Sequence, residues 1–392
     1  MIIKNLAKFS VLFLLASCSS ESDNRSLTKP NSNSQFEKLD IVFSDILSFS
    51  LDSITSNESD YVQYFENGEQ ELLGYLNKYD NSISIFDIKK KKKLKVLKIP
   101  EEFMNKHNIR RFLGFHFYDL ENAILIPKMR KKIILADFLK GDFVNFSYEE
   151  ISEQSEWPIP FPRASYMNPV IILDSSYYMT VYPDGNWNAI DNIDTRPVCY
   201  QVDLTGTNNP DFLHLTYPVN YYEDGPTQPY FSQCFNGQNE FVYSFFADDI
   251  IYVADERHTR WREISAPSRL RGDFLKVKLN PTMDEYLKFH IETAAYLWIT
   301  YDKYRKCYYR LVAVGSEFDP KKDLMKQVNF RKLSLMVLNE KLEVVNETML
   351  ENRFNYKNYF VGTEGLYLSL SNPVNDSYEE DQLKFQLIEL KK

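Results

Sequence analysis

The sequence predicts an all-β protein that folds as a single β-propeller of about six blades, with five or seven blades as the alternatives. Three observations lead to this prediction. Strand-like runs that end in an acid or Asn recur roughly every 60 residues, Phe and Tyr are abundant while Gly is scarce, and the last repeat lacks an outer strand.

The repeat is an apolar alternation that ends in an acid or Asn just before a hairpin turn. Its six copies end at Asp87, Asp137, Asp203, Asp255, Asn339 and Glu389. Further strand-like runs precede each copy, so every unit contains several strands. One four-stranded sheet cannot bury both of its faces, whereas radial stacking against neighbouring sheets buries them. The repeat therefore indicates a propeller, and its uneven spacing leaves the number of blades open by one.

Composition agrees with a β fold. The 392 residues include 28 Phe and 27 Tyr but only 12 Gly. Aromatic side chains favour strands because they suit flat, half-buried surfaces.

The two ends of the chain are expected to close the ring. Residues 39–53 have strand character and no nearby partner, and the chain stops after a strand-like run over 382–390. We expect 39–53 to supply the outer strand of the last blade, because this hides an otherwise open edge. The predicted propeller domain spans residues 36–392.

The N-terminus has the layout of a secretory signal. Lys4 and Lys8 precede an apolar run over 9–15 that is too short to span a bilayer permanently. Ala16-Ser17-Cys18 then resembles a bacterial lipobox. The resemblance implies a signal peptide over 1–17, lipidation of Cys18 and a membrane partner through that anchor. An ordinary signal peptide with an incidental Cys is the alternative.

The segment that follows Cys18 is predicted to be a disordered tether. Residues 18–35 are mostly Ser, Asn, Thr and charged side chains, which cannot bury enough surface to fold. Acidic residues directly after the Cys resemble the surface-export signal of Bacteroidetes lipoproteins, with a solvated linker as the alternative. We therefore expect a cell-envelope protein anchored to the outer membrane, on its periplasmic side or at the cell surface.

Two further stretches resemble a known family. They are 231–237 leading into 240–245, and Tyr301-Asp302 with 307–310. Together with Cys18, they are similar to a family of Bacteroidetes lipoproteins that is known only as domain of unknown function 4221 and to which a propeller fold is attributed. The resemblance covers nearly the whole chain. It implies a fold and a location but no activity.

Charge and motifs narrow the classes of function. Loss of residues 1–17 removes Lys4 and Lys8 and changes the net charge from −9 to −11, which argues against nucleic acid as a partner. The sequence has no nucleophile elbow, phosphate-binding loop or metal-ligand spacing. We therefore predict no cofactor and no metal site, and the sequence assigns no catalytic residue.

The predicted ligand-binding residues lie in loops that a propeller gathers on one face. Trp157 and Arg163 flank a Pro-rich stretch, Trp187 lies in a turn region, and Tyr221 and Tyr222 precede an acidic turn. Aromatic side chains beside Arg are typical of binding hot spots, and aromatic faces stack on sugar rings. The alternative is that these aromatic side chains only pack the loops against the blades and bind no ligand.

The leading hypothesis is a non-catalytic binding or scaffolding lipoprotein whose ligand is a glycan, a peptide or a protein. One alternative is a propeller-type glycan hydrolase or lyase, which would need paired carboxylates in the central funnel. The loops offer Asp184, Asp191, Glu223 and Asp224 for that role. The other alternative is a structural subunit of an outer-membrane complex, which would need an exposed apolar patch.

Overall fold

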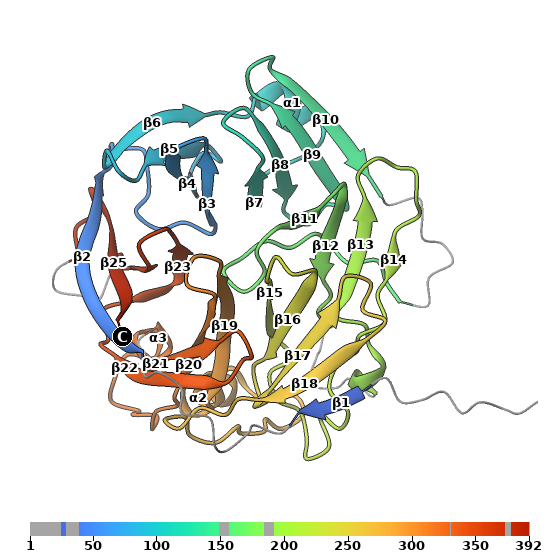
Figure 1. Cartoon of the computed structure of the whole chain (residues 1–392), viewed down its shortest axis with the longest axis vertical. Coiled ribbons are helices and arrows are strands. Elements are labelled where there is room, and N and C mark those ends of the chain that lie inside the picture. The colour runs from blue at the N-terminus through green and yellow to red at the C-terminus, as the bar shows by residue number, and fades with distance from the viewer. Residues whose placement is uncertain are drawn as a thin grey trace, which may run out of the picture.

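A computed structural model describes residues 25–28, 39–148, 157–183, 192–329, 331–372 and 378–391. Within these ranges the protein is a ring of six antiparallel sheets (Figure 1). Each sheet is one blade, and its first strand lies nearest the central axis. The predicted all-β propeller with six blades is confirmed.

The first three blades follow the chain in order. From the inner to the outer strand, blade 1 consists of β3 (Val62–Asn67), β4 (Gln70–Leu76), β5 (Ile83–Asp87) and β6 (Lys92–Leu97). Blade 2 consists of β7 (Phe112–Phe117), β8 (Asn122–Pro127), β9 (Lys132–Asp137) and β10 (Asp142–Ser147). Blade 3 consists of β11 (Ile171–Leu173), β12 (Ser176–Thr180), β13 (Cys199–Asp203) and β14 (Asp211–Phe212).

The last three blades complete the ring. Blade 4 consists of β15 (Phe231–Phe235), β16 (Glu240–Phe245), β17 (Ile250–Asp255) and β18 (Trp261–Ser265). Blade 5 consists of β19 (Ala295–Asp302), β20 (Cys307–Ala313), β21 (Leu333–Asn339) and β22 (Val344–Leu350). Blade 6 consists of β23 (Asn355–Val361), β24 (Leu366–Ser369), β25 (Gln382–Lys391) and β2 (Asp40–Ser50).

Blade 6 combines both ends of the chain. The N-terminal strand β2 pairs antiparallel with the C-terminal strand β25, from Asp40 opposite Lys391 to Ser50 opposite Gln382, with one irregularity between Phe43 and Ile46. Figure 1 shows β2 in blue beside β25 in red. The predicted closure by the N-terminal strand is confirmed. It joins the ring with backbone hydrogen bonds and leaves β25 without an open edge.

The sequence repeat marks the third strand of every blade. In blades 1 to 5, the acid or Asn at its end accepts a hydrogen bond from the backbone of the following turn. The side chain of Asp87 accepts a hydrogen bond from the backbone N–H of Lys90 at 2.8 Å, and Asn339 accepts one from Lys341 at 2.9 Å. Asp137, Asp203 and Asp255 accept equivalent bonds. Short polar side chains that bond backbone amides a few residues ahead stabilise tight turns. The motif therefore recurs in blades 1 to 5 because each outer hairpin needs the same turn. The sixth copy, at Glu389, lies within β25, which pairs with β2 instead of turning into a hairpin.

Neighbouring blades pack through aromatic rings. Gly74 of β4 lies so close to blade 2 that a Cβ atom there would come within 2.7 Å of the Phe115 ring. Between blades 5 and 6, the rings of Trp298 and Tyr359 stack with their centroids 4.0 Å apart. Close contact between flat side chains buries both faces of each sheet, which explains the abundance of Phe and Tyr.

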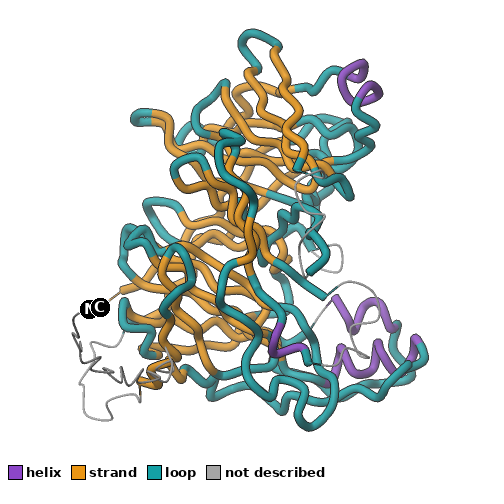
Figure 2. The backbone as a smooth tube through the Cα atoms, turned by 90° about the vertical axis from the view of Figure 1, so that its right-hand side faces the viewer, coloured by secondary structure: helices purple, strands orange, loops and turns teal. Residues whose placement is uncertain are grey.

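The two faces of the ring differ in the length of their loops. The connections from each outer strand to the next blade, together with the middle hairpins, lie on one side, which we call the loop face. It carries α1 (Glu101–Lys106), α2 (Met283–Glu292), α3 (Leu324–Asn329) and the short η2 (Ile193–Thr195). Figure 2 shows the helices on the same side of the molecule. The long connections of the loop face also explain the uneven intervals of the repeat.

The N-terminal segment contributes one more strand. β1 (Arg25–Thr28) pairs parallel with β18 at the rim of blade 4, with Arg25 opposite Trp261. It falls within the predicted tether over 18–35; the remainder of that segment, with Cys18 and the predicted signal peptide, lies outside the described residues. No helix in the described ranges is both long and apolar enough to cross a membrane. Cys199, Cys234 and Cys307 are buried free thiols.

Candidate functional site

A cavity of about 330 Å³ opens on the loop face above blade 3. Three connections build it, those that follow β10, β12 and β14. We call it the aromatic pocket, and its walls are Trp157, Pro158, Pro160, Val181, Tyr182, Pro183, Arg196, Pro197 and Tyr217. Such a volume lies at the lower end of the range for small-molecule sites, and a mostly apolar wall with a few polar groups is typical of them.

Trp157 and Arg196 form the most distinctive contact of this pocket. The guanidinium carbon of Arg196 lies 5.1 Å from the centre of the Trp157 ring system. A cation over the face of an indole is attracted by the negative charge of that face. The Nε atom of Arg196 is buried and has no hydrogen-bond partner among the described residues. The stack therefore holds a positive charge at the wall of the pocket.

Arg163 contacts the part of the wall that Tyr182 forms. Its guanidinium carbon is 5.1 Å from the centre of the Tyr182 ring. The Tyr182 hydroxyl accepts a hydrogen bond from Nδ2 of Asn168 at 2.8 Å and donates to the carbonyl oxygen of Phe231. Burial raises the pKa of Tyr182, so this side chain remains a neutral hydrogen-bonding group. The wall is fixed by these bonds before any ligand arrives.

Tyr217, Tyr221 and Tyr222 form a column of rings beside the pocket. The ring centroids of Tyr217 and Tyr221 are 6.0 Å apart, and those of Tyr221 and Tyr222 are 5.8 Å apart. Tyr221 is buried, and its hydroxyl donates to the Gln228 carbonyl at 2.8 Å and accepts from the Ala247 amide at 3.2 Å. Tyr221 therefore helps to fix the ring of Tyr217, which lines the pocket.

Tyr222 differs from its neighbour. Its hydroxyl is buried but has no hydrogen-bond partner among the described residues. Burial raises the pKa of Tyr222, and the nearby charge of Arg196 opposes that rise.

The structure brings four of the five predicted ligand-binding residues into this region. Trp157 lines the pocket, Arg163 and Tyr222 lie close to it, and Tyr221 packs against the lining residue Tyr217. Trp187 lies outside the described residues. Sequence reasoning missed Tyr182, Arg196 and Tyr217. Arg196 stands in the connection that follows β12, as Trp187 does, and this shared connection was the available signal.

The central channel contains a second cavity, of about 270 Å³. Its lining residues are Tyr61, Val62, Gln63, Tyr64, His116, Ser165, Tyr166, Pro169, Val170, Thr300, Lys357, Tyr359, Phe360 and Val361. This lining contains aromatic, amide and hydroxyl groups and one lysine, and none of these residues is a carboxylate. Burial lowers the pKa of His116 to about 4, so this side chain is neutral at pH 7.

The segment 163–170 crosses the axis and ties the blades together. The Tyr359 hydroxyl donates to the Tyr166 carbonyl at 2.9 Å, and the Gln233 amide donates to the Met167 carbonyl at 3.0 Å. The Val170 amide donates to the Tyr61 hydroxyl at 2.9 Å. Because these bonds reach blades 6 and 4 and the start of blade 1, they hold the segment that carries Arg163 on a rigid base.

A larger cavity, of about 810 Å³, lies between α2 and α3. Its lining mixes Glu317, Asp319 and Asp323 with Lys322, Lys326 and Lys332. Lys322 and Asp319 approach within 3.6 Å. Acidic and basic side chains are mixed along this lining and can pair with one another, so the cavity offers a ligand neither a single sign of charge nor an apolar wall. We therefore place the candidate site at the smaller aromatic pocket.

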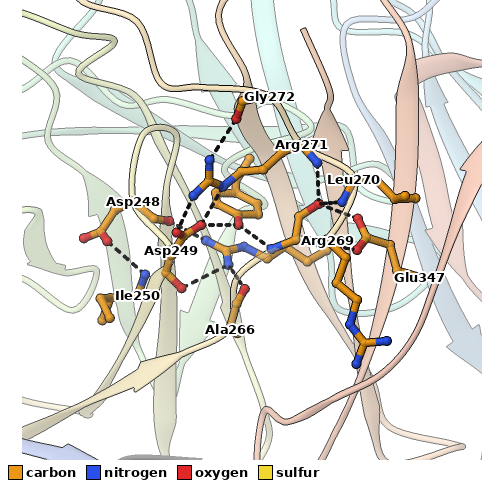
Figure 3. A network of polar contacts seen from close by, with 12 residues as sticks. Asp248, Asp249, Ile250, Ala266, Arg269, Leu270, Arg271, Gly272 and Glu347 are labelled. Atoms are coloured by element: carbon orange, nitrogen blue, oxygen red, sulfur yellow. Dashed lines mark hydrogen bonds and ion pairs between the residues drawn. The ribbon is translucent and has the colours of Figure 1, made fainter.

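Two arginines in the connection before α2 have different environments (Figure 3). Arg271 makes a two-pronged ion pair with Asp249, at 2.9 Å from Nε and 2.6 Å from Nη2. The Arg269 side chain is exposed and points away from this pair, while its backbone amide donates to Glu347 at 2.7 Å. Burial raises the pKa of the neighbouring Asp248 to about 6. The network anchors the connection to blades 4 and 5.

The acidic groups proposed for an enzyme are not gathered in the described part of the channel. Glu223 and Asp224 are exposed in the connection between β14 and β15, and Asp184 and Asp191 lie outside the described residues. Within the described ranges, no group of three or more His, Cys, Asp or Glu side chains could hold a metal ion.

Comparison with solved structures shows the same fold in two proteins. A member of the DUF4221 family from Bacteroides vulgatus is 24% identical, with a TM-score of 0.77 over 91% of this chain and 99% of that one. A protein from Bacteroides fragilis whose name suggests export is 10% identical, with a TM-score of 0.52 over 94% of this chain and 100% of that one. No curated protein matches the sequence. Residues 38–349 match the family described as "Domain of unknown function (DUF4221)", and the chain therefore belongs to this family.

Proposed function

We propose that this protein is a lipid-anchored cell-envelope protein that binds a ligand in the aromatic pocket of its propeller. The observation that carries the proposal is the convergence of three loop-face connections on one cavity, whose wall contains Trp157, Tyr182 and Arg196. Loops held by a rigid scaffold are where propellers and other β folds place their binding residues.

The form of the pocket favours binding over a purely structural role for these aromatics. Tyr221 and Tyr217 are buried and explain how the loops are held. Trp157 and Arg196 are only half-buried and still border open space. The pocket combines a rigid apolar wall with one charged group, which gives a ligand both contact area and orientation.

The ligand class we favour is a glycan, with a peptide or a protein partner as the other outcomes of a binding screen. A propeller hydrolase or lyase would hold paired carboxylates at the axis, where the central cavity instead contains aromatic, amide and hydroxyl groups. The net charge of the mature chain makes nucleic acid an unsuitable partner.

Replacing Trp157 tests the pocket. The first step is a glycan and peptide binding screen with the full-length protein in detergent. For a ligand found in this way, Trp157→Ala is expected to weaken binding roughly thirtyfold, because truncation of an aromatic hot spot costs about 2 kcal/mol or more. Calorimetric titration measures the affinity.

The matched control is Tyr79→Ala. Tyr79 is also an aromatic residue of the loop face, but it is 73% exposed and does not line the pocket. Its replacement should leave the affinity unchanged. If Trp157→Ala lowers the melting temperature but leaves binding unchanged, the Trp157 ring only packs its loop against the blade and the proposed site is wrong.

The anchor is tested separately at Cys18. The native protein should carry a diacylglyceryl or triacyl adduct in its intact mass, since two or three acyl chains at about 0.8 kcal/mol per buried methylene hold a protein stably in a membrane. Cys18→Ala should lose the adduct and leave the membrane fraction. A variant that fractionates with membranes as before would contradict lipid anchoring at this position.

A further inference from the structure

Arg196 has no anionic partner in the part of the chain that the structure describes. Among the described residues, no carboxylate forms an ion pair with it, and its Nε has no hydrogen-bond acceptor. Asp194 is only two residues away in η2, yet no hydrogen bond or ion pair joins their side chains. The charge of Arg196 therefore remains available to an anionic group that enters the pocket.

The contact with Trp157 places this cation at the wall of the pocket. A guanidinium is planar, and its five N–H donors point outward within the plane. When an indole contacts its face, the donors at its edge remain for another group. Two parallel N–H donors match the two oxygens of a carboxylate, and such bonds are about twice as strong as those between neutral groups.

A second positive charge strengthens the local field. Arg163 stacks on Tyr182, which forms the neighbouring part of the wall. The two guanidinium groups therefore flank the pocket of a protein whose full sequence carries a net charge of −9. This local reversal of sign favours an anionic ligand at this place on the loop face.

The apolar part of the wall indicates what carries the anionic group. Four prolines, at positions 158, 160, 183 and 197, line the pocket, and a proline has no backbone N–H. A peptide backbone would therefore find few partners for its carbonyl groups here. A sugar ring, by contrast, can place its C–H face against proline and aromatic surfaces, and one ring fits a cavity of about 330 Å³.

We propose that the aromatic pocket binds a sugar residue that carries a carboxylate, a uronic acid at the end of a glycan, with Arg196 receiving the carboxylate beside Trp157. This inference rests on the proposed function and adds the charge and chemical class of the ligand. The buried Tyr222 hydroxyl has no hydrogen-bond partner among the described residues, and its ring belongs to the column beside the pocket, so it is a candidate donor to the same acid group.

The test compares a charged ligand with an uncharged analogue of the same structure. Tri-galacturonic acid and its full methyl ester share the same rings but differ in charge. The full-length protein in detergent is titrated with each by calorimetry. The acid is expected to bind at least tenfold more tightly than the ester, and only binding of the acid should weaken as salt rises from about 0.05 to 0.5 M, because salt screens the charge of the guanidinium.

Variants assign the effect to Arg196. Arg196→Gln should weaken binding of the acid about thirtyfold and leave the ester unchanged, since a lost charge-assisted pair costs about 2 kcal/mol. Arg196→Lys keeps the charge without the planar donors and should retain part of the preference. Arg269→Gln is the matched control, because it removes an exposed arginine of the same face.

Three results would overturn the inference: equal binding of acid and ester, an unchanged preference in Arg196→Gln, or no binding of either sugar. If Arg196→Gln does not fold, the salt dependence of binding and the preference of Arg196→Lys for the acid over the ester still test the inference. Failure of the proposed function is recognised differently, by screened ligands whose affinity does not depend on Trp157. A neutral ligand that depends on Trp157 would leave that function standing and exclude only the acidic sugar.

Discussion

Deletion of residues 36–55 is expected to abolish cooperative unfolding of the propeller. The deletion removes β2, whose backbone pairs with β25 along nearly its full length. It also removes Leu47 and Phe49, which are only 5% and 1% exposed. The Phe49 ring lies 4.7 Å from Phe86 of blade 1, so β2 connects the last blade to the first.

The size of this effect follows from the burial. Loss of one buried Leu or Phe side chain costs about 2–5 kcal/mol, and the strand contributes two together with its ladder of hydrogen bonds. The sum is comparable to the whole stability of a domain, about 5–15 kcal/mol. We expect a shortened chain that is unfolded, or that aggregates through the exposed edge of β25.

A second deletion provides the comparison. Removal of residues 19–34 takes away the tether and the four-residue β1 but leaves β2 in place. Its thermal unfolding, followed by circular dichroism, should match that of the parent within a few degrees. If the 36–55 deletion also unfolds like the parent, closure of the ring by β2 is not what stabilises it.

Arg310→Met is expected to destabilise the protein by roughly 3–5 kcal/mol. Arg310 is completely buried. Its guanidinium donates to the Ser244 hydroxyl at 2.8 Å and to the backbone carbonyls of Ala266 and Asp248 at 2.9 Å each. Methionine fills much of the volume but satisfies none of these acceptors, and each buried carbonyl left without a donor costs about 1–3 kcal/mol.

The aromatic contact of Arg310 adds to this loss. Its guanidinium carbon lies 3.2 Å from the centre of the Tyr296 ring, and the Tyr296 hydroxyl donates to Asp249 at 2.6 Å. Denaturant unfolding measures the effect as a shift of the midpoint. Arg260→Met is the control, since the Arg260 side chain is 84% exposed and its replacement should change stability by less than about 0.5 kcal/mol. Equal shifts in both variants would contradict a structural role for the buried guanidinium.

The propeller was predictable because its signals are local and repeated. In blades 1 to 5, each third strand alternates apolar residues and ends in a side chain that accepts a hydrogen bond from its own turn, as Asp87 and Asn339 do. Those contacts lie within a few residues, so the pattern appears in the chain itself. Closure by β2 was also predictable. The last blade lacks an outer strand and the N-terminal strand lacks a partner, so pairing the two completes the ring.

The candidate site was only partly predictable. Knowledge of the propeller places the connections that carry Trp157, Arg163 and Tyr222 on one face, and the structure brings these three residues together. The sequence could not separate Tyr221 from Tyr222, although one has its hydroxyl bonded to Gln228 and Ala247 and the other has no such bond. That difference depends on which strands and loops pack against each ring.

By itself, the sequence determined the β-propeller fold, the repeated motif that marks the third strand of each blade, the closure of the ring and the face on which the long loops gather. Only the tertiary structure decided that Arg196 stacks on Trp157, that segment 163–170 crosses the axis, and that the central cavity is lined without carboxylates. The physical reason is range. Turns and strand periodicity are set by neighbours in the chain, whereas a pocket is set by side chains that meet only after distant connections have packed against one another.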